Sequence, residues 1–508
     1  ESILQRFRSN TTADNYFKLL AEESQFILVG AQSALYNLSM VTLEEQRRIE
    51  WNSSEANIQL CLIKGKAEKD CHNFIRLALK KGDNELFVCG TNAYKANCRH
   101  YNITQTEYNF VKEESGEGYC ANDHRYSSTA LFVDNNLYAG TVAGFSGVDA
   151  LIYRNPLRTE QFNLKQLNKP RFVSSMHYAD QVYFFFREAA DEHIRAAYTV
   201  SRVARVCAND KGGPHRIRNR WTSFLKAGLN CLVTLKNEDL LPFNDLQSTT
   251  DIVNGVYNGV REDIVYGVFT SSSKSFVSSA VCAYRMKDIQ EVFRGRIKSA
   301  TYSKYSEIEQ TVGSCVNDSR SLPNATLEFL QNHELMDNAV PALWNVPIIV
   351  QTSLKFRYTQ ITVDKQLETV SGRYFDVLYI GTNDGRVLKV VNVANNRMKH
   401  HGNHNQNAPI VSEDITVFPP NTSINKLVVY RTHCEQKLII VTDNEIKSIP
   451  LNNCEAKANS CTKCVALQDP YCAWNLAQKI CTGSYERFME RERFAQNVET
   501  GFDSKCTE

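Results

Sequence analysis

Length, composition and charge are those of a soluble globular protein and exclude two classes of partner. The 508 residues are 43% hydrophobic and 22% charged, and 58 basic against 56 acidic residues give a formal charge of +2. This near balance predicts no nucleic-acid partner and no general attraction to an anionic membrane. The sequence has no run of 18 or more apolar residues that could span a bilayer.

Pairs of strand-like runs recur along the chain. Each pair is an apolar, β-branched or aromatic run, a turn of small residues and a second such run, which is typical of a buried strand, a hairpin turn and a half-buried strand. The seven first runs are 26–30, 86–90, 137–141, 182–186, 264–268, 378–382 and 438–441. Their mean spacing favours the blades of a β-propeller. Separate β-sandwiches are the alternative, but no linker rich in Pro, Gly or Ser precedes residue 450.

Two further features of the sequence concern the strand that closes the predicted ring and an insertion within it. A propeller avoids exposed strand edges only if it closes, and the run 16–20 is the candidate strand that completes the last blade. The interval between Tyr266 and Leu378 predicts an insertion. Within it, 324–333 is expected to form a short amphipathic helix anchored by Leu327, Phe329 and Leu330. Such an insertion either builds specific contacts or is an inert decoration.

Sixteen cysteines and seven Asn-x-Ser/Thr sequons favour an oxidised, glycosylated product of the secretory pathway. The alternative is a reduced cytosolic protein with thiols in its core. The sequons begin at Asn10, Asn37, Asn52, Asn102, Asn317, Asn324 and Asn421. Because the chain starts at Glu1 without a hydrophobic leader, we expect any signal peptide to have been removed, and we expect a continuation beyond Cys506.

The spacing of the cysteines favours disulfides over a metal site. Six of them lie in the last 55 residues, where little apolar core can form. Cys461 and Cys464 could be half of a zinc site, but a second pair at suitable spacing is missing. The upstream cysteines are Cys61 and Cys71, Cys89 and Cys98, which bracket short loops, and Cys207, Cys231, Cys282 and Cys315, which could form two long-range bridges. Cys120 and Cys434 remain as buried thiols, as a pair, or as a bridge between two chains.

Motifs of catalysis are missing, so the chain is predicted not to be an enzyme and to need no cofactor. It has no nucleophile elbow, no phosphate-binding Gly-rich loop and no His-Glu-x-x-His helix. The cluster His400, His401 and His404 could bind a transition metal, although a polar loop is the favoured interpretation. The basic run 215–220 could bind heparan sulfate through Arg216, Arg218 and Arg220, or it could be an ordinary charged surface.

Several stretches resemble the Sema domain of the semaphorin family: 86–101, 139–149, 205–213, 221–226 and 333–337. The segment 468–474, Gln-Asp-Pro-Tyr-Cys-Ala-Trp, is similar to the signature of the plexin–semaphorin–integrin (PSI) module. The chain departs from the family at 120–123, where Cys-Ala-Asn-Asp replaces the usual Cys-Pro-Tyr-Asp. The N-terminal half is most similar to the invertebrate membrane-anchored class 1 semaphorins.

This resemblance implies an all-β fold: a seven-bladed β-propeller over residues 1–452 with an insertion in blade five, followed by a small disulfide-rich PSI domain over 453–508. It also implies seven disulfides. They are Cys61–Cys71, Cys89–Cys98, Cys207–Cys315, Cys231–Cys282, Cys454–Cys472, Cys464–Cys481 and Cys461–Cys506.

The resemblance further implies an extracellular ligand that binds plexin receptors and acts in axon guidance and cell migration. It places the receptor contact on the propeller edge near blades three and four, where Arg187, Glu188, Glu192 and His193 are candidate contacts that face solvent; a plain solvated hairpin tip is the alternative. A homodimer is compatible with the family. The chain would be secreted, or attached to the outer face of the plasma membrane by an anchor outside this sequence. A plexin-type or Met-type receptor ectodomain is the alternative function.

Overall fold

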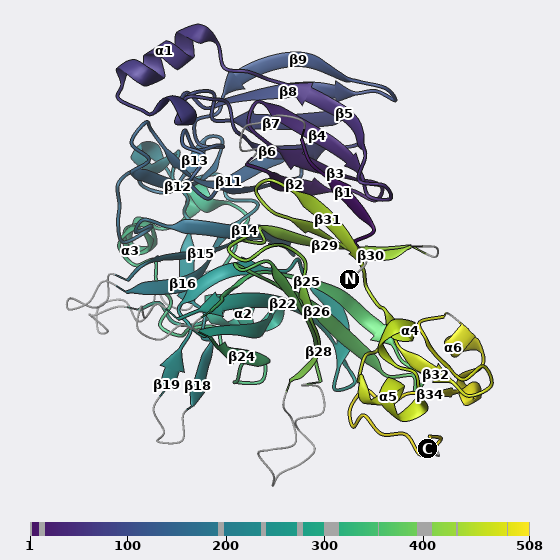
Figure 1. The fold of residues 1–508 in the computed structure, drawn as a ribbon. Coiled ribbons are helices and arrows are strands. Elements are labelled where there is room, and N and C mark those ends of the chain that lie inside the picture. The colour runs from purple at the N-terminus through teal and green to yellow at the C-terminus, as the bar shows by residue number, and fades with distance from the viewer. Residues whose placement is uncertain are drawn as a thin grey trace.

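Seven antiparallel sheets follow one another along the chain, and a small domain follows them (Figure 1). The computed structural model describes residues 3–9, 16–190, 198–234, 240–271, 278–298, 314–353, 355–393, 409–432, 435–484 and 486–506. The first strand of each sheet contacts the first strand of the next sheet, and the contact between β29 and β2 completes the cycle. The predicted seven-bladed propeller is therefore confirmed.

The blades are four-stranded, with one additional strand in blade five. Blade one comprises β2 (Lys18–Glu22), β3 (Phe26–Gly30), β4 (Ala34–Ser39) and β5 (Glu45–Glu50), and blade two comprises β6 (Ile75–Lys81), β7 (Glu85–Gly90), β8 (Asn97–Ile103) and β9 (Tyr108–Ser115). Blade three comprises β10 (Thr129–Val133), β11 (Asn136–Ala143), β12 (Asp149–Arg154) and β13 (Leu157–Arg158), and blade four comprises β14 (Arg171–Tyr178), β15 (Gln181–Ala189), β16 (Thr199–Cys207) and β17 (Leu225–Gly228). Blade five comprises β20 (Asp245–Thr249), β21 (Val253–Tyr257), β22 (Val260–Thr270), β23 (Ser278–Arg285) and β24 (Ile349–Thr352). Blade six comprises β25 (Tyr358–Glu368), β26 (Tyr374–Thr382), β27 (Arg386–Val391) and β28 (Ile410–Thr416). Blade seven comprises β29 (Lys426–Arg431), β30 (Gln436–Val441), β31 (Ile446–Pro450) and β1 (Gln5–Phe7). The strands β18 (Leu232–Thr234) and β19 (Leu240–Pro242) pair antiparallel in a separate two-stranded sheet.

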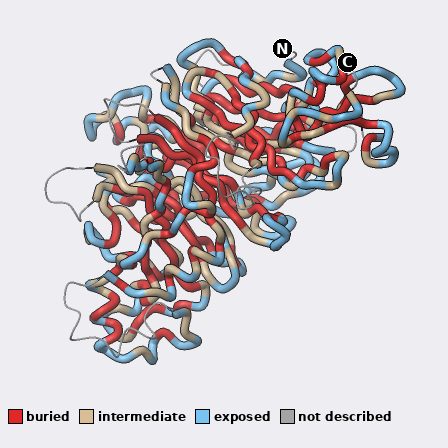
Figure 2. Tube along the Cα trace, turned by 90° about the horizontal axis from the view of Figure 1, so that it is seen from below, coloured by how far each residue is buried: buried red, intermediate tan, exposed pale blue. Residues whose placement is uncertain are grey.

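The second strand of every blade is the one that the sequence predicted. The seven apolar runs lie in β3, β7, β11, β15, β22, β26 and β30. In β15, residues 182–186 are all buried, because neighbouring blades cover both faces of the sheet and both sets of alternating side chains must be apolar. Figure 2 shows buried residues through the inside of the molecule and exposed residues along the turns at its periphery.

The strand that closes the ring is β1, so the prediction for the run 16–20 is wrong. β1 is the outer strand of blade seven and pairs antiparallel with β31, with Gln5 opposite Ser448 and Phe7 opposite Ile446. Lys18–Glu22 is β2, the inner strand of blade one. The buried carboxylate of Glu445 forms ion pairs with Arg6 and Arg8, so charge as well as strand pairing holds β1 in place.

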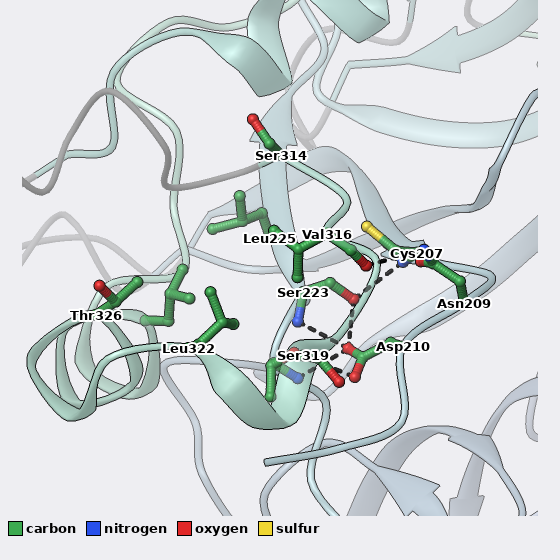
Figure 3. A pocket seen from close by; sticks show the side chains of 12 residues that line it. Cys207, Asn209, Asp210, Ser223, Leu225, Ser314, Val316, Ser319, Leu322 and Thr326 are labelled. Carbon is green, nitrogen blue, oxygen red and sulfur yellow. Dashed lines mark hydrogen bonds between the residues drawn. The ribbon is translucent and has the colours of Figure 1, made fainter.

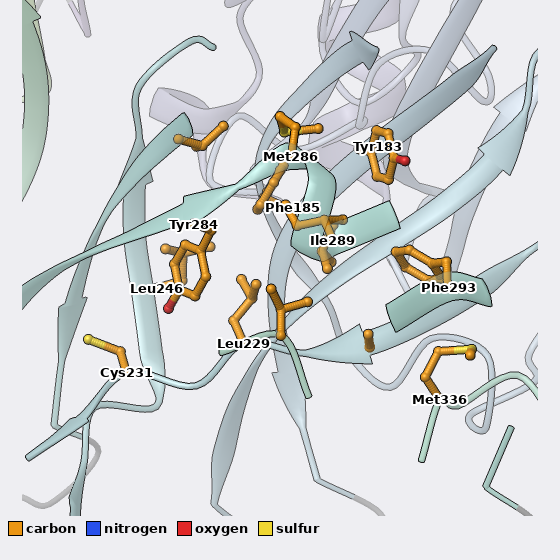
Figure 4. Packing of buried hydrophobic residues seen from close by; sticks show 14 of the residues in the cluster. Tyr183, Phe185, Leu229, Cys231, Leu246, Tyr284, Met286, Ile289, Phe293 and Met336 are labelled. Atoms are coloured by element: carbon orange, nitrogen blue, oxygen red, sulfur yellow. The ribbon is translucent and has the colours of Figure 1, made fainter. Parts of the chain in front are cut away.

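The blade-five insertion lies between β23 and β24 and extends the core of blade four. It contains α2 (Met286–Arg294) and α3 (Asn324–Asn332), and the predicted anchors Leu327, Phe329 and Leu330 are buried. A cavity of about 20 Å³ separates its α3 end from β17, with Leu225 on one side and Leu322 and Thr326 on the other (Figure 3). Figure 4 shows Phe293 and Met336 of the insertion packed with Tyr183 and Phe185 of β15 in one buried cluster.

The C-terminal domain has a small sheet in the order β33 (Ile480–Thr482), β32 (Ala473–Asn475), β34 (Phe494–Ala495). Its helices are α4 (Cys454–Lys457), α5 (Cys461–Ala466) and α6 (Glu486–Met489). The domain lies beside blade six (Figure 1). There Lys389 of β27, which is fully buried, contacts Asp469, and the Tyr471 hydroxyl donates to Asp364 of β25. These contacts fix the domain on the propeller.

Seven disulfides join the pairs that the resemblance implied. They are Cys61–Cys71, Cys89–Cys98, Cys207–Cys315, Cys231–Cys282, Cys454–Cys472, Cys461–Cys506 and Cys464–Cys481. Cys120 is a free thiol that is 3% exposed, and burial raises its pKa to about 12. Of the three options for Cys120, the buried thiol is therefore the right one. Cys434 lies outside the described residues.

One sequon conflicts with the fold. Asn37 is 3% exposed in β4, and its amide donates to the Tyr108 hydroxyl at 2.7 Å, so a glycan has no room there. The asparagines of five other sequons are exposed and remain predicted glycosylation sites: Asn52, Asn102, Asn317, Asn324 and Asn421. Asn10 and the cluster His400, His401 and His404 lie outside the described residues. Among the described helices, none combines the length and apolar character needed to cross a membrane.

Candidate functional site

A groove of about 820 Å³ lies where blades three and four meet. Large apolar side chains in its walls are exposed to solvent: Val148, Phe162 and Leu164 are 66%, 60% and 55% exposed. Tyr126 adds a further exposed ring. Contiguous exposed apolar side chains in a concave site are typical of a surface that binds another molecule.

The rim of the groove is cationic. Arg125, Lys169 and Arg171 line it and are exposed. The acidic group at this rim, Asp123, is already bound, because Arg125 approaches its carboxylate at 2.7 Å and the Tyr94 hydroxyl donates to it at 2.9 Å. Burial alone would raise the pKa of Asp123, but hydrogen bonds from Arg125 and Tyr94 lower it to about 2. Asp123 therefore stays ionised at physiological pH and offsets the charge of Arg125, so the net positive charge of the rim comes from Lys169 and Arg171.

The turn between β11 and β12 forms the outer wall of the groove through a close backbone approach. Gly147 has φ +65°, and a Cβ at this position would lie 2.5 Å from the Tyr126 ring. The turn therefore holds Val148 and the Tyr126 ring on one side of the groove. Residues of the segment 162–171, which connects blades three and four, form another part of the wall.

Two of the four predicted contact residues do not face solvent as expected. β15 continues to Ala189, three residues beyond the apolar run, so Arg187 and Glu188 lie within a sheet and not at a hairpin tip. Arg187 reaches toward blade five and forms an ion pair with Asp245 at 2.9 Å, and its side chain is only 17% exposed. Glu188 is 3% exposed. Glu192 and His193 lie outside the described residues.

Glu188 is a buried structural carboxylate. It accepts hydrogen bonds from the Lys226 Nζ at 2.7 Å, the Arg202 Nε at 3.3 Å and the Asn168 backbone N–H at 2.9 Å. Asn168 belongs to the segment that carries Phe162 and Leu164, and its carbonyl accepts the N–H of Ala189. Glu188 therefore fixes one wall of the groove against blade four, a role that local sequence did not indicate.

Two family models match the chain, the Sema domain over residues 246–431 and the plexin repeat over 453–507. Semaphorin-1A of Schistocerca americana is 44% identical over 100% of this chain and 70% of that protein. The chain belongs to the semaphorin family. Semaphorin-1A of Drosophila melanogaster is 42% identical over 99% of this chain and 57% of that protein, so the match is to the invertebrate class 1 members, as predicted. This semaphorin chain thus spans only part of its curated relatives.

Solved structures of semaphorins have the same fold. Extracellular domains 1–2 of Drosophila Semaphorin 1a match over 100% of both chains, with 41% identity and a TM-score of 0.90. A structure of Drosophila Plexin A in complex with Semaphorin 1b matches with 38% identity and a TM-score of 0.88, over 98% of this chain and 97% of that one. The described semaphorin chain therefore corresponds to the extracellular Sema and PSI domains of its relatives.

The insertion of this semaphorin pairs with β17 at Lys226, and the Lys226 side chain bonds to Glu188, which holds the groove wall at Asn168. The backbone N–H of Lys226 donates to the Glu334 carbonyl at 2.7 Å, and the Met336 N–H donates to the Lys226 carbonyl at 2.8 Å. The insertion thus adds a short parallel pairing to the outer edge of blade four. Lys226 lies near two buried carboxylates, those of Glu188 and Glu334, but it bonds directly to Glu188.

Replacing Glu334 by glutamine is expected to stabilise this semaphorin at neutral pH by on the order of 1 kcal/mol, because a buried, poorly compensated charge is costly. Glu334 is 6% exposed, and burial raises its pKa, with Lys226 opposing the rise. A raised carboxyl pKa means that the folded state loses stability as the pH rises through that pKa. The increase in the free energy of unfolding caused by Glu334→Gln should therefore be present at pH 7 and disappear on acidification. Urea unfolding at both pH values measures it, with exposed Glu328→Gln as the control; an equal gain at both pH values would contradict the electrostatic cause.

Proposed function

We propose that this semaphorin is an extracellular ligand that binds plexin receptors through its propeller and thereby signals in axon guidance and cell migration. The observation that carries the proposal is the match to the solved complex of Drosophila Plexin A with Semaphorin 1b, at 38% identity over 98% of this chain. The receptor alternative has less support, because the relatives at 42–44% identity are semaphorins.

The groove between blades three and four is the proposed docking surface. Exposed Phe162, Leu164 and Val148 offer apolar anchors, and binding energy in protein interfaces is concentrated in such anchors when the partner desolvates them. Lys169 and Arg171 line the same groove, and Arg125 lies there paired with Asp123, so the matching receptor surface is an apolar side chain flanked by carboxylates. The contacts predicted for Glu192 and His193 remain predictions.

A titration against purified plexin ectodomains tests both parts of the proposal. The wild-type ectodomain is expected to bind at least one plexin, and Phe162→Ala with Leu164→Ala should weaken that binding about 30-fold or more, as expected for the loss of interface anchors. The matched control is Val256→Ala with Val260→Ala, which removes two similarly exposed apolar side chains from blade five. Unchanged affinity of the groove variant would contradict the placement, and no binding of the wild type to any plexin would contradict the function.

The proposal gives the chain no enzymatic activity, and its support is the membership in a family of signalling ligands. We also propose that the propeller domain ends at residue 452 and the PSI domain begins at 453. Strand β31 ends at Pro450, α4 begins at Cys454 and the plexin-repeat match begins at 453.

A further inference from the structure

The loop between β16 and β17 is closed by one buried carboxylate. Asp210, which is 2% exposed, accepts hydrogen bonds from the Gly212 N–H at 2.8 Å, from the Thr222 N–H and hydroxyl at 2.9 and 3.1 Å, and from the Ser223 N–H and hydroxyl at 3.0 and 2.6 Å. Figure 3 shows Asp210 and Ser223 in this arrangement. Both ends of the segment 211–221 are therefore held at one point, and a fully satisfied buried network of this kind is rigid.

The same segment is anchored on both sides. Ser319 of the insertion accepts the Lys211 N–H at 3.0 Å and donates to the Gly212 carbonyl at 2.9 Å. Gly212 has φ +79°, and a Cβ there would lie 2.1 Å from the Arg218 carbonyl oxygen, so the two arms of the loop touch. On the other side, the Trp221 ring N–H donates to the Ile152 carbonyl of blade three at 2.9 Å. The segment 211–221 is thus preorganised.

This rigid segment presents arginines at alternate positions. Arg216 and Arg218 are exposed, and within the described residues neither has an acidic partner. Arg220 lies 3.4 Å from Glu160, and Arg158, which forms a parallel backbone bridge with Arg220, contacts Asp149 at 2.7 Å. The exposed side chains of Lys211 and Arg320 belong to the same loop and to the adjoining insertion. The six cations are called the basic loop surface: Arg158, Lys211, Arg216, Arg218, Arg220 and Arg320.

A cavity of about 220 Å³ opens among these arginines. Arg158, Arg216 and Arg220 line it together with the amides of Gln166 and Gln331. Guanidinium groups bind oxyanions through paired N–H donors, and amides suit hydroxyl groups. Glu160 and Asp149 offset part of the charge of the cavity, so a single small anion gains little there. A polymer that extends from the cavity to Arg218 gains several contacts at once.

We propose that the basic loop surface binds a sulfated polysaccharide chain of the heparan sulfate type. Charge complementarity and an extracellular family favour this occupant. A nucleic acid is disfavoured because Trp221, the aromatic ring that lines the cavity, is 7% exposed and offers no stacking face to a base. This inference goes beyond the receptor proposal: the segment 159–171 lines both the cavity and the groove, but through different side chains.

Binding to immobilised heparin over a series of NaCl concentrations tests the inference without any plexin present. Arg216→Glu with Arg218→Glu is expected to elute at clearly lower salt and to bind about tenfold more weakly at 0.15 M NaCl, since contacts between exposed charges are lost and screened. The control is Lys355→Glu with Lys365→Glu, the same change of charge at exposed positions near and on blade six, and it should elute like the wild type.

Three results of the binding measurements would overturn the inference, in addition to the displacement result given last. The first is an equal loss of heparin affinity in the Arg216→Glu, Arg218→Glu variant and in the control variant. The second is that the wild type binds chemically desulfated heparin as tightly as heparin. The third is that it binds single-stranded DNA as tightly as heparin, which would indicate a surface for any polyanion. Inorganic sulfate at millimolar concentration should displace little heparin, and complete displacement would contradict a site for a chain. Because plexin is absent from this experiment, its outcome is independent of the receptor proposal.

Discussion

Replacing Lys389 by methionine is expected to lower the free energy of unfolding by about 3–5 kcal/mol, the cost of leaving a buried charge without its partner. The Lys389 side chain is fully buried between blade six and the PSI domain. Its Nζ donates to Asp469 at 2.5 Å, to the Leu451 carbonyl at 2.8 Å and to Glu413 at 3.3 Å. Methionine fills a similar volume but leaves two buried carboxylates without this cation, so the effect is electrostatic and not a cavity.

Denaturant unfolding measures this loss, and limited proteolysis between residues 450 and 454 reports whether the PSI domain detaches. Adding Asp469→Asn to Lys389→Met should restore part of the stability, because one of the uncompensated charges is removed. The control is Lys457→Met, which removes the other cation on Glu413 from a side chain that is 27% exposed. It should cost less than about 1 kcal/mol, as for a partly exposed pair. If Lys389→Met also lowers the free energy of unfolding by less than about 1 kcal/mol, the buried-charge explanation is wrong.

Removing the disulfide between Cys207 and Cys315 is expected to cost about 4 kcal/mol, by the loop-closure entropy of the unfolded chain. The two cysteines are 108 residues apart in sequence, although the nested Cys231–Cys282 bond shortens the effective loop. The bond ties the end of β16 to the insertion, so its loss should also loosen α3 locally.

Urea unfolding of the Cys207→Ala, Cys315→Ala variant measures the first effect, and hydrogen exchange of the α3 amides measures the second. The comparison is Cys61→Ala with Cys71→Ala, a bond that spans only 10 residues, which should cost about 3 kcal/mol and leave α3 exchange unchanged. Equal α3 exchange in both variants would show that the Cys207–Cys315 bond does not hold the insertion.

The second strands of the blades were predictable because both of their faces are buried. A strand covered on both sides is apolar through most of its length, so β15 and β26 contain continuous apolar runs that are visible in the sequence. The outer strands carry no such signal. β1 has three residues, Gln-Arg-Phe, and β13 has two, and both owe their position to pairing with a neighbouring strand and not to local pattern.

The candidate site was less accessible to sequence reasoning. The burial of Glu188 depends on Lys226 and Arg202, which come from other strands, and no local feature distinguishes it from the neighbouring charges of 186–193. Phe162 and Leu164 lie in a connection without periodicity, so the sequence alone does not tell whether they are buried or exposed. The arginines at 216, 218 and 220 were visible as a basic run, but their rigidity depends on Asp210 and on the distant Ser319.

The position of β1 sets the order of events during synthesis. Gln5 leaves the ribosome long before its partner Ser448, which follows only after nearly the whole propeller has been made. Until then blade seven consists of β29 and β30 and lacks β31, the strand with which β1 pairs. Ring closure is therefore the last folding step of the propeller, and a prematurely terminated chain keeps an open, unpaired sheet that chaperones of the secretory pathway can recognise.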